Sequence, residues 1–381
     1  MPARGLLVSL TLVIVAALAA CGPVAPAPGM PGPGTPSAAR SATGAAAPGG
    51  SVPGSGPAGR SPGASGRARA TAAGPAITLA FAGDVHFAGR TAALLKDPAR
   101  AFGSISSVLR SADLTMLNLE TAITRRGVPQ PKTYHFRTTP AAFTALRDAG
   151  VDLVTMANNH VLDFGQTGLA DTLAAAKAAR FPVVGIGVNA AAAWAPYVTT
   201  IRGTPIAIIG VSQVAELASS WVATGSRPGE ANAVSLRRTL SAVRAARKLA
   251  RIVIVFMHWG TEGESCPDAN QLSLAPRLAA AGASIIIGAH AHMLQGSGWL
   301  GRTFVAYGMA NFLWWENSYS TATGVLKLTI QPHRPLAARF IPAVVSATGQ
   351  PVVLTGAAAK RAAESYARLR SCTGLSARPA R

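Results

Sequence analysis

Short apolar runs alternate with alanine-rich segments along most of this chain, beginning at Ala76. The runs have the length and β-branched content of buried strands, and the alanine-rich segments have the length of helices. Strands that alternate with helices favour a sheet that is covered on both faces. We therefore predict an α/β domain. The predicted strands cover residues 77–82, 114–117, 151–156, 205–211, 252–257, 283–287, 303–306 and 324–330, and the predicted helices cover residues 140–149, 166–180, 235–251 and 271–281.

Five of the predicted strands are followed directly by side chains that can bind metal ions. Ligand sites in open α/β sheets gather just beyond the carboxyl ends of the strands, so these five tips can meet at one site. A lone histidine at a strand end is more often structural, but five of the seven histidines of the chain lie in these tips. The tips are Asp84 with His86, Glu120, Asn159 with His160, His258, and His290 with His292.

The chemistry of these side chains favours a catalytic metal site over a structural one. They offer imidazole nitrogens, carboxylates and an amide oxygen, and the strand tips contain no cysteine. Such a set suits Mn, Fe or Zn in an open site better than a closed structural zinc. Five tips also supply more ligands than one ion needs. A pair of divalent ions bridged by a carboxylate is the expected arrangement.

The order of these motifs resembles a known group of proteins. Gly83-Asp84-Val85-His86, Asn159-His160, His258 and Gly288-x-His290-x-His292 follow the order of blocks in the metallophosphoesterase-like superfamily. The strings Asn118-Leu119-Glu120, Asn158-Asn159-His160 with Asp163 and Gly165, His258-Trp259-Gly260-x-Glu262 and Tyr307 to Phe312 resemble its CapA branch, the capsule-synthesis and poly-γ-glutamate biosynthesis proteins. The resemblance covers residues 77–328. It implies an αββα sandwich with metal ligands at the carboxyl-terminal tips of the strands.

Two residues depart from the usual pattern of that family. Ala310 stands where the family usually has a glycine before the late Asn-Phe pair, and Ala291 stands where the closing motif often has a proline. Neither departure removes a ligand.

The resemblance also implies a role for each residue of the site. One ion would be held by Asp84, His86 and His292, and a second by Asn159, His258 and His290. Glu120 occupies the bridging place, where the parent superfamily has an aspartate. His160 takes the place of a general acid, near enough to protonate a leaving group. Residues expected to orient these ligands or to contact substrate are Asp163, Glu262, Arg137 and Asn311.

The first 75 residues differ from the rest in composition. Residues 1–21 have the pattern of a secretion signal that ends in Leu18-Ala19-Ala20-Cys21, the form of a bacterial lipobox in which the cysteine is acylated. The alternative is an ordinary cleaved signal with a chance cysteine. Residues 22–75 are almost entirely Pro, Gly, Ala and Ser, which predicts a flexible tether. The expected place of the protein is the outer face of the cytoplasmic membrane, held there by a lipid on Cys21.

Two further segments complete the predicted organisation. Residues 76–345 form the CapA-like domain, and residues 346–381 form a carboxyl-terminal helix and tail. In an oxidising compartment Cys266 and Cys372 could form a disulfide, but sequence separation does not show whether they meet. Trp314 and Trp315 could bind a polymer if exposed, although packing near the site is the more common role of such a pair.

The charge of the chain points to anionic partners. Lys and Arg number 35 against 15 Asp and Glu. Such a balance favours anionic lipid headgroups or an anionic cell-surface polymer. No nucleic-acid partner is expected, because no binding motif accompanies the charge.

Two functions remain open from the sequence. The first is a metal-dependent hydrolase of phosphoester or amide bonds, which by family resemblance would act in capsule or poly-γ-glutamate synthesis and export. The second is a non-catalytic factor that binds the polymer or assembles with membrane proteins of polymer synthesis and export.

Overall fold

The computed structural model describes residues 75–332 and 334–380. The predicted signal peptide, the lipidation site Cys21 and all but the last residue of the predicted tether lie outside this range. Within the described residues, every helix falls short of the length and hydropathy that crossing a membrane requires.

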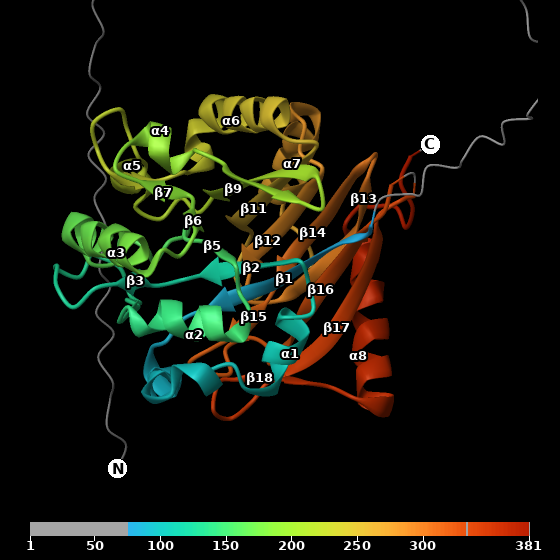
Figure 1. Ribbon diagram of the computed structural model, residues 1–381, viewed down its shortest axis with the longest axis horizontal. Coiled ribbons are helices and arrows are strands. Elements are labelled where there is room, and N and C mark those ends of the chain that lie inside the picture. The colour runs from blue at the N-terminus through green and yellow to red at the C-terminus, as the bar shows by residue number, and fades with distance from the viewer. Residues whose placement is uncertain (1–74, 333, 381) are drawn as a thin grey trace, which may run out of the picture. The chain divides into compact units, whose positions relative to one another are not determined.

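Two β-sheets lie at the centre of the fold (Figure 1). The first has eight strands. Its strands β6, β5, β2 and β1 are parallel, and β16, β17 and β18 extend it in antiparallel pairing, while the short β15 (Asn311–Leu313) pairs with the end of β1. In spatial order these strands are β18 (Pro351–Val353), β17 (Ala337–Val345), β16 (Ala322–Ile330), β1 (Ile77–Val85), β2 (Leu114–Leu119), β5 (Leu153–Thr155) and β6 (Val183–Val184).

The second sheet has six strands with a parallel centre. Strands β9, β11, β12 and β14 are parallel, and antiparallel strands close both edges. In order these are β13 (Leu294–Leu300), β14 (Thr303–Met309), β12 (Ile285–His290), β11 (Ile252–Trp259), β9 (Thr204–Ser212) and β8 (Tyr197–Ile201). Two short pairs complete the strands, β7 (Ile186–Gly187) with β10 (Gly229–Glu230) and β3 (Ala122–Ile123) with β4 (Arg137–Thr138).

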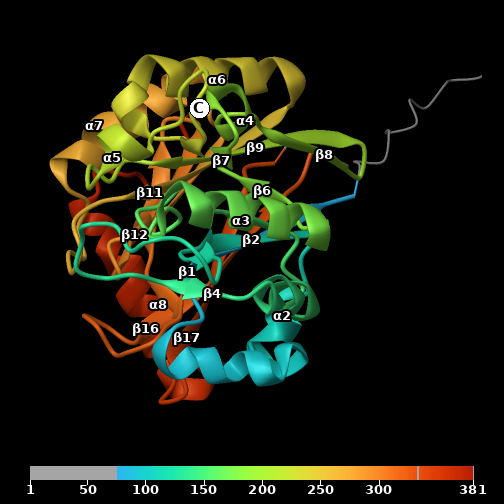
Figure 2. The same ribbon diagram turned by 90° about the vertical axis from the view of Figure 1, so that its left-hand side faces the viewer.

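Helices cover the outer faces of both sheets, as Figures 1 and 2 show. Helices α6 and α7 pack on the second sheet, and α2 and α3 pack on the first. Helix α8 lies against β17 and β13. The helices are α1 (Ser106–Leu109), α2 (Ala141–Ala149), α3 (Gly165–Ala179), α4 (Ala190–Ala193), α5 (Ala218–Trp221), α6 (Leu236–Leu249), α7 (Ala269–Ala281) and α8 (Gly356–Arg368). The result is the αββα sandwich expected for a metallophosphoesterase-like fold.

Alternating side chains of the strands fill the layers on either side of each sheet. On β1, Leu79 and Phe81 enter the core between the sheets, where Ile254 of β11 also lies. The intervening Ala80 points to the opposite face, toward α2 and its Phe143. Because both faces of each sheet are buried, the central strands read as continuous apolar runs rather than as an apolar and polar alternation.

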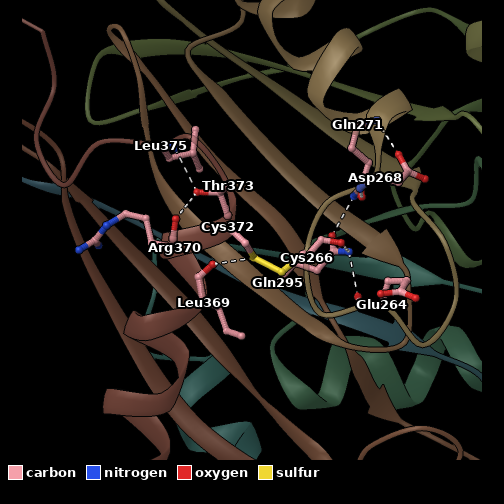
Figure 3. The surroundings of a disulfide bond; sticks show 10 residues. All are labelled: Glu264, Cys266, Asp268, Gln271, Gln295, Leu369, Arg370, Cys372, Thr373 and Leu375. Atoms are coloured by element: carbon pink, nitrogen blue, oxygen red, sulfur yellow. Dashed lines mark hydrogen bonds between the residues drawn. A yellow bond between two sulfur atoms is a disulfide. The ribbon is translucent and has the colours of Figure 1, made fainter.

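A disulfide ties the carboxyl-terminal segment to the loop before α7 (Figure 3). Cys266 and Cys372 are bonded, with their Cα atoms 5.8 Å apart. Beside Cys266, Asp268 caps α7 through a reciprocal capping box with Gln271. Gln295 donates from Nε2 to the carbonyl of Cys266 at 3.2 Å, which joins this loop to β13. The pairing that the sequence left open is therefore present.

Each of the eight predicted strands overlaps an observed strand, and each predicted helix overlaps an observed helix. The missed strands are edge or near-edge strands. In β8 three of the five residues are half-buried and two are exposed, and two of the five are threonine. Strand β17 contains Pro342, so neither strand shows a buried apolar run. Residues 346–381, predicted as a helix and tail beyond the domain, also contribute β18 to the first sheet.

Candidate metal centre

The predicted ligands meet between the two sheets, at the carboxyl ends of the parallel strands. Asp84 is the residue before the last of β1, Glu120 follows β2, and His258 lies near the end of β11. All three side chains are fully buried. Register explains the convergence within each sheet. Asp84 on β1 lies beside Asn118 on β2, and His290 on β12 lies beside Trp259, the residue after His258.

Glu120 lies at the middle of the centre. Glu120, His290 and His292 present ligand atoms within 4.8 Å of one another, and so do Asp84, Glu120 and His258. Glu120 Oε1 is 3.3 Å from His258 Nε2. Glu120 thus belongs to both groups, which is the place that a bridging carboxylate needs.

The centre contains buried polar atoms that protein groups leave unsatisfied. Among the described residues, Glu120 Oε1 and His290 Nδ1 have no hydrogen-bond partner. An unpaired buried polar atom costs about 1–3 kcal/mol, so native structures rarely keep one without a reason. Both atoms belong to residues of the two groups. Carboxylate oxygens and imidazole nitrogens are also ligands of divalent transition metals, so the residues present fit metal ions.

Burial and charge set opposite protonation states within the centre. Burial and the neighbouring Asp84 raise the pKa of Glu120 well above its usual value. Burial lowers the pKa of His258 to about 3, which leaves it neutral and able to donate a lone pair. Burial would also lower the pKa of His292, but its hydrogen bond to Asp84 and the charge of Glu120 raise it to about 9. A cation on His292 therefore balances the clustered carboxylates.

Two asparagines and one backbone amide hold these ligands in place. Asn118 Nδ2 donates to Asp84 Oδ1 at 2.8 Å and lies 3.1 Å from His258 Nδ1. The amide of His290 donates to Asp84 Oδ2 at 3.0 Å. Asn311 Oδ1 is 2.8 Å from His292 Nδ1, which leaves His292 Nε2 free for another contact. Asn311 therefore orients a ligand, the first of the two roles expected for it.

Asn159 and Glu262 lie at different positions around the buried ligands. Asn159 Oδ1 lies 2.8 Å from His258 Nε2, so the amide faces the expected ion position. Glu262 is farther out, since its Oε1 is 3.9 Å from His292 Nε2 and its Oε2 accepts from the Tyr319 hydroxyl at 3.0 Å. Glu262 thus lies at the opening of the centre.

His160 is held by a buried chain of charged groups. Its Nδ1 is 2.7 Å from Asp163 Oδ2, and Asp163 Oδ1 is 3.1 Å from Lys132 Nζ. The Lys132 side chain is 2% exposed and also pairs with Glu216 at 3.1 Å. Burial raises the pKa of Asp163 to about 6. Burial and the charge of Lys132 lower the pKa of His160 well below its usual value.

The basic residue beside the metal centre is not the one that the sequence predicted. Arg137 is exposed, and its guanidinium lies over the Phe164 ring at 4.6 Å, away from the ligands. The buried cation of the site is Lys132, five residues earlier in the same segment. Lys132 was missed because nothing in the local sequence distinguishes a buried lysine from a solvated one. Its only signal in the sequence is that it lies five residues before Arg137.

His86 stands apart from the other predicted ligands. It belongs to neither of the two ligand groups found among the described residues. Its ring stacks on Phe136, with centroids 4.3 Å apart and planes at 6°, and its Nδ1 accepts a hydrogen bond from the Ala88 amide at 3.1 Å. The ring of Trp314 contacts both His86 and His292, with centroid distances of 4.3 and 4.7 Å.

Tight backbone packing brings the ligands together. A side-chain carbon on Gly83 would lie 1.8 Å from the Ala310 carbonyl oxygen, and one on Gly288 would lie 1.8 Å from that of Tyr307. His290, His292 and Ala310 all have positive φ, at 89°, 54° and 59°. At Ala310 this conformation suits the glycine that the family usually has there, so the departure leaves a strained residue beside the ligands.

A pocket of about 180 Å³ opens onto His160 and His292. Its walls are aromatic, and its charged rim consists of Glu262 and Glu316, with no lysine or arginine among the lining residues. Trp314 is buried, as favoured for this pair, while Trp315 is half-buried and also lines the pocket. The aromatic lining residues are Tyr134, Phe136, Trp314, Trp315 and Tyr319.

Known proteins are similar in sequence to part of this chain. The chain is 28% identical over 219 residues to the capsule biosynthesis protein CapA of Bacillus anthracis, covering 56% of this chain and 53% of that protein. It is 29% identical over 215 residues to the PGA biosynthesis protein CapA of Bacillus subtilis, covering 56% of each. The chain therefore spans about half the length of these curated relatives.

Solved structures with partial similarity include the NAD nucleotidase of Haemophilus influenzae, with 17% identity and a TM-score of 0.44. That comparison covers 80% of this chain and 65% of the nucleotidase.

A family model described as bacterial capsule synthesis protein PGA_cap matches residues 78–314, which hold all the predicted metal ligands. The chain belongs to this family.

Proposed function

We propose that this protein is a metal-dependent hydrolase that acts outside the cytoplasmic membrane in the synthesis or export of an anionic cell-surface polymer. The observation that carries the proposal is Glu120, a fully buried carboxylate shared by two groups of ligands and left with an unpaired oxygen. The names of the relatives, which refer to capsule and PGA biosynthesis, support the polymer setting.

Two divalent ions fit the proposed centre. One would be held by Asp84, Glu120 and His258, together with the Asn159 amide oxygen, and the other by Glu120, His290 and His292. Such ions supply Lewis acidity and make a water-derived nucleophile available near neutral pH. His86 would contribute by packing against Phe136 and Trp314 rather than as a direct ligand.

His160 is the residue best placed to move a proton. With its Nδ1 proton donated to Asp163, its Nε2 carries the lone pair, and this side chain lines the pocket. Because the pKa of His160 is below its usual value, the ring is neutral near pH 7 and can accept the proton that the attacking water releases. It can then deliver that proton to a leaving group. Lys132 and Asp163 are positioning residues that fix the ring and its tautomer.

Metal content is the test that separates this proposal from a non-catalytic binding role. The wild-type protein should bind about two Mn, Fe or Zn ions per chain, as expected for a carboxylate-bridged pair. The His258→Ala variant should bind fewer and should lose hydrolysis of phosphodiester or γ-glutamyl amide probes. His135→Ala is the matched control, because His135 lies outside both ligand groups and contacts the Gln130 carbonyl. A folded wild-type protein that takes up no ion would refute the hydrolase.

The membrane anchor is a separate part of the proposal, supported by the Leu18-Ala19-Ala20-Cys21 pattern. Wild-type protein should incorporate labelled palmitate and fractionate with membranes. A Cys21→Ser variant should lose the label and leave the membrane fraction. Labelling that persists in Cys21→Ser would show that the anchor is elsewhere.

A further inference from the structure

A second cavity lies at the end of the sandwich opposite the metal centre. Its volume is about 1020 Å³. It is lined where the parallel strands begin, by Ile77 of β1, Thr204 of β9 and Ile252 of β11. Figure 1 shows the start of β1 and the carboxyl terminus at this same end. Asp84 lies seven residues farther along β1, about 23 Å away at the usual rise of a strand.

Four arginines from four separate segments line this cavity, which we call the arginine pocket: Arg251, Arg302, Arg334 and Arg378. No acidic residue is among its lining residues. Elsewhere in the described chain, arginines do find carboxylates, as Arg126 does with Asp171 and Arg202 with Asp113. None of the four pocket guanidinium groups forms a hydrogen bond or an ion pair with a described residue.

The segments that carry these arginines are held by backbone hydrogen bonds. Arg302 lies in the turn between the paired strands β13 and β14. Arg378 lies on the carboxyl-terminal tail, where Ser376 exchanges backbone hydrogen bonds with Trp299 at 2.8 and 2.9 Å and Ala380 donates to Gly301 at 2.8 Å. The Arg251 amide donates to the Pro205 carbonyl at 3.1 Å. Three of the four cations therefore project from a hydrogen-bonded backbone into one concave site.

Part of the pocket lining is apolar. Trp299, Ile330 and Leu336 line it alongside the arginines. A ligand that suits both features has anionic groups joined by short apolar stems. Guanidinium groups bind carboxylates through paired hydrogen bonds, and several of them together favour a ligand with many carboxylates over a single one. A concave site of this size favours a chain over the flat surface of a bilayer.

We propose that the arginine pocket binds a segment of a polycarboxylate chain and so holds polymer on the protein at a distance from the metal centre. This inference rests on the proposed function for the identity of the polymer. The two sites are separate in charge as well as in position, because the pocket at the metal centre has an acidic rim, whereas the described residues that line the arginine pocket include no Asp or Glu.

The test measures binding of a fluorescent γ-linked glutamate oligomer to the full chain in detergent. The variant Arg302→Gln with Arg378→Gln should weaken binding by up to about fivefold for each guanidinium removed, the upper range for an ion pair between exposed groups. The control is Arg237→Gln with Arg244→Gln, which removes the same charge from exposed positions on α6. The control should bind as wild type does.

Three results would overturn the proposal. These are equal weakening in both double variants, no binding of the oligomer by wild type, or binding only to phosphatidylcholine vesicles that contain phosphatidylglycerol. Free glutamate should compete poorly, and effective competition would indicate a site for a single small anion instead.

Metal content separates this proposal from the proposed function. The Arg302→Gln, Arg378→Gln variant should retain its ions, and His258→Ala should retain oligomer binding. If wild type binds no metal and the oligomer still binds in the arginine pocket, the hydrolase fails while this proposal stands.

Discussion

The two ends of the sandwich carry charge in opposite ways. At the carboxyl ends of the strands, charged and polar side chains are buried and tied to one another, as Asp84 is to Asn118 and to the His290 amide. At the amino ends, four arginines are exposed and have no described acidic partner. Because the groups of the metal centre are buried, their geometry is fixed and the loss of one group should have a large effect. Because the four arginines are exposed, each should contribute separately to binding, and the loss of one should have a small effect.

The largest expected effect comes from the disulfide that joins the loop after β11 to the carboxyl-terminal segment. Cys266 follows the strand that carries His258, and Cys372 precedes the tail that carries Arg378. Replacing both cysteines with serine should lower the free energy of unfolding by about 4–5 kcal/mol, the chain-entropy value for a loop of this length. Chemical denaturation would measure the change. Oligomer binding should weaken too, as the tail loosens, whereas a stable variant with full binding would show that the tail docks without the disulfide.

A change at Glu120 should affect the metal centre and leave the arginine pocket unchanged. Glu120→Gln keeps the shape of the side chain but removes the charge shared by the two ligand groups. Removing a group that only hydrogen-bonds to a metal ligand commonly lowers metal affinity about 10–100-fold. Loss of the charge on Glu120, a direct ligand, should therefore lower it by more than about 100-fold. Metal titration followed by mass spectrometry measures it. Oligomer binding should be unchanged, and a parallel loss there would mean that the two ends are coupled.

The pH dependence of the two ends should also differ. The pKa of His292 is raised from 6.5 to about 9, so its second ring proton is present at neutral pH and must leave when Nε2 binds an ion. Metal affinity should therefore rise with pH until about pH 9, by about tenfold per unit for this one proton. Arginine stays protonated throughout, so oligomer binding should be flat over the same range. A metal affinity independent of pH would contradict the ligand role of His292.

The smallest expected effect tests the strain at the metal end. Ala310 has a φ of 59°, which costs a residue with a side chain about 1–2 kcal/mol. Ala310→Gly removes that strain but adds freedom to the unfolded chain, for a net gain of about 0.5–1 kcal/mol. The control is Ala245→Gly at an exposed position inside α6, which should destabilise by about 1 kcal/mol. If both variants shift the urea midpoint downward alike, Ala310 is not strained.

The positions of the central strands along the chain, and of the predicted ligands that follow them, could be predicted from the sequence for a local reason. An apolar run predicts a buried strand, and a residue that follows a parallel strand lies at a known edge of its sheet. Asp84, Glu120, His258 and His290 could therefore be placed together without coordinates. His86 occupies the same kind of position, yet its ring turns toward Phe136, because the direction of a side chain depends on neighbours from distant segments.

Only the tertiary structure decided which segments far apart in the chain contact one another. Periodicity shows which face of an element is buried, but it carries no information about which buried faces or exposed turns meet. Three features depend on such meetings. Lys132 is buried against Asp163, Cys266 is bonded to Cys372, and Arg302 and Arg378 share a cavity with two other arginines. In the sequence those four arginines are isolated residues among many, and only the packing of strand ends and tail brings them to one site.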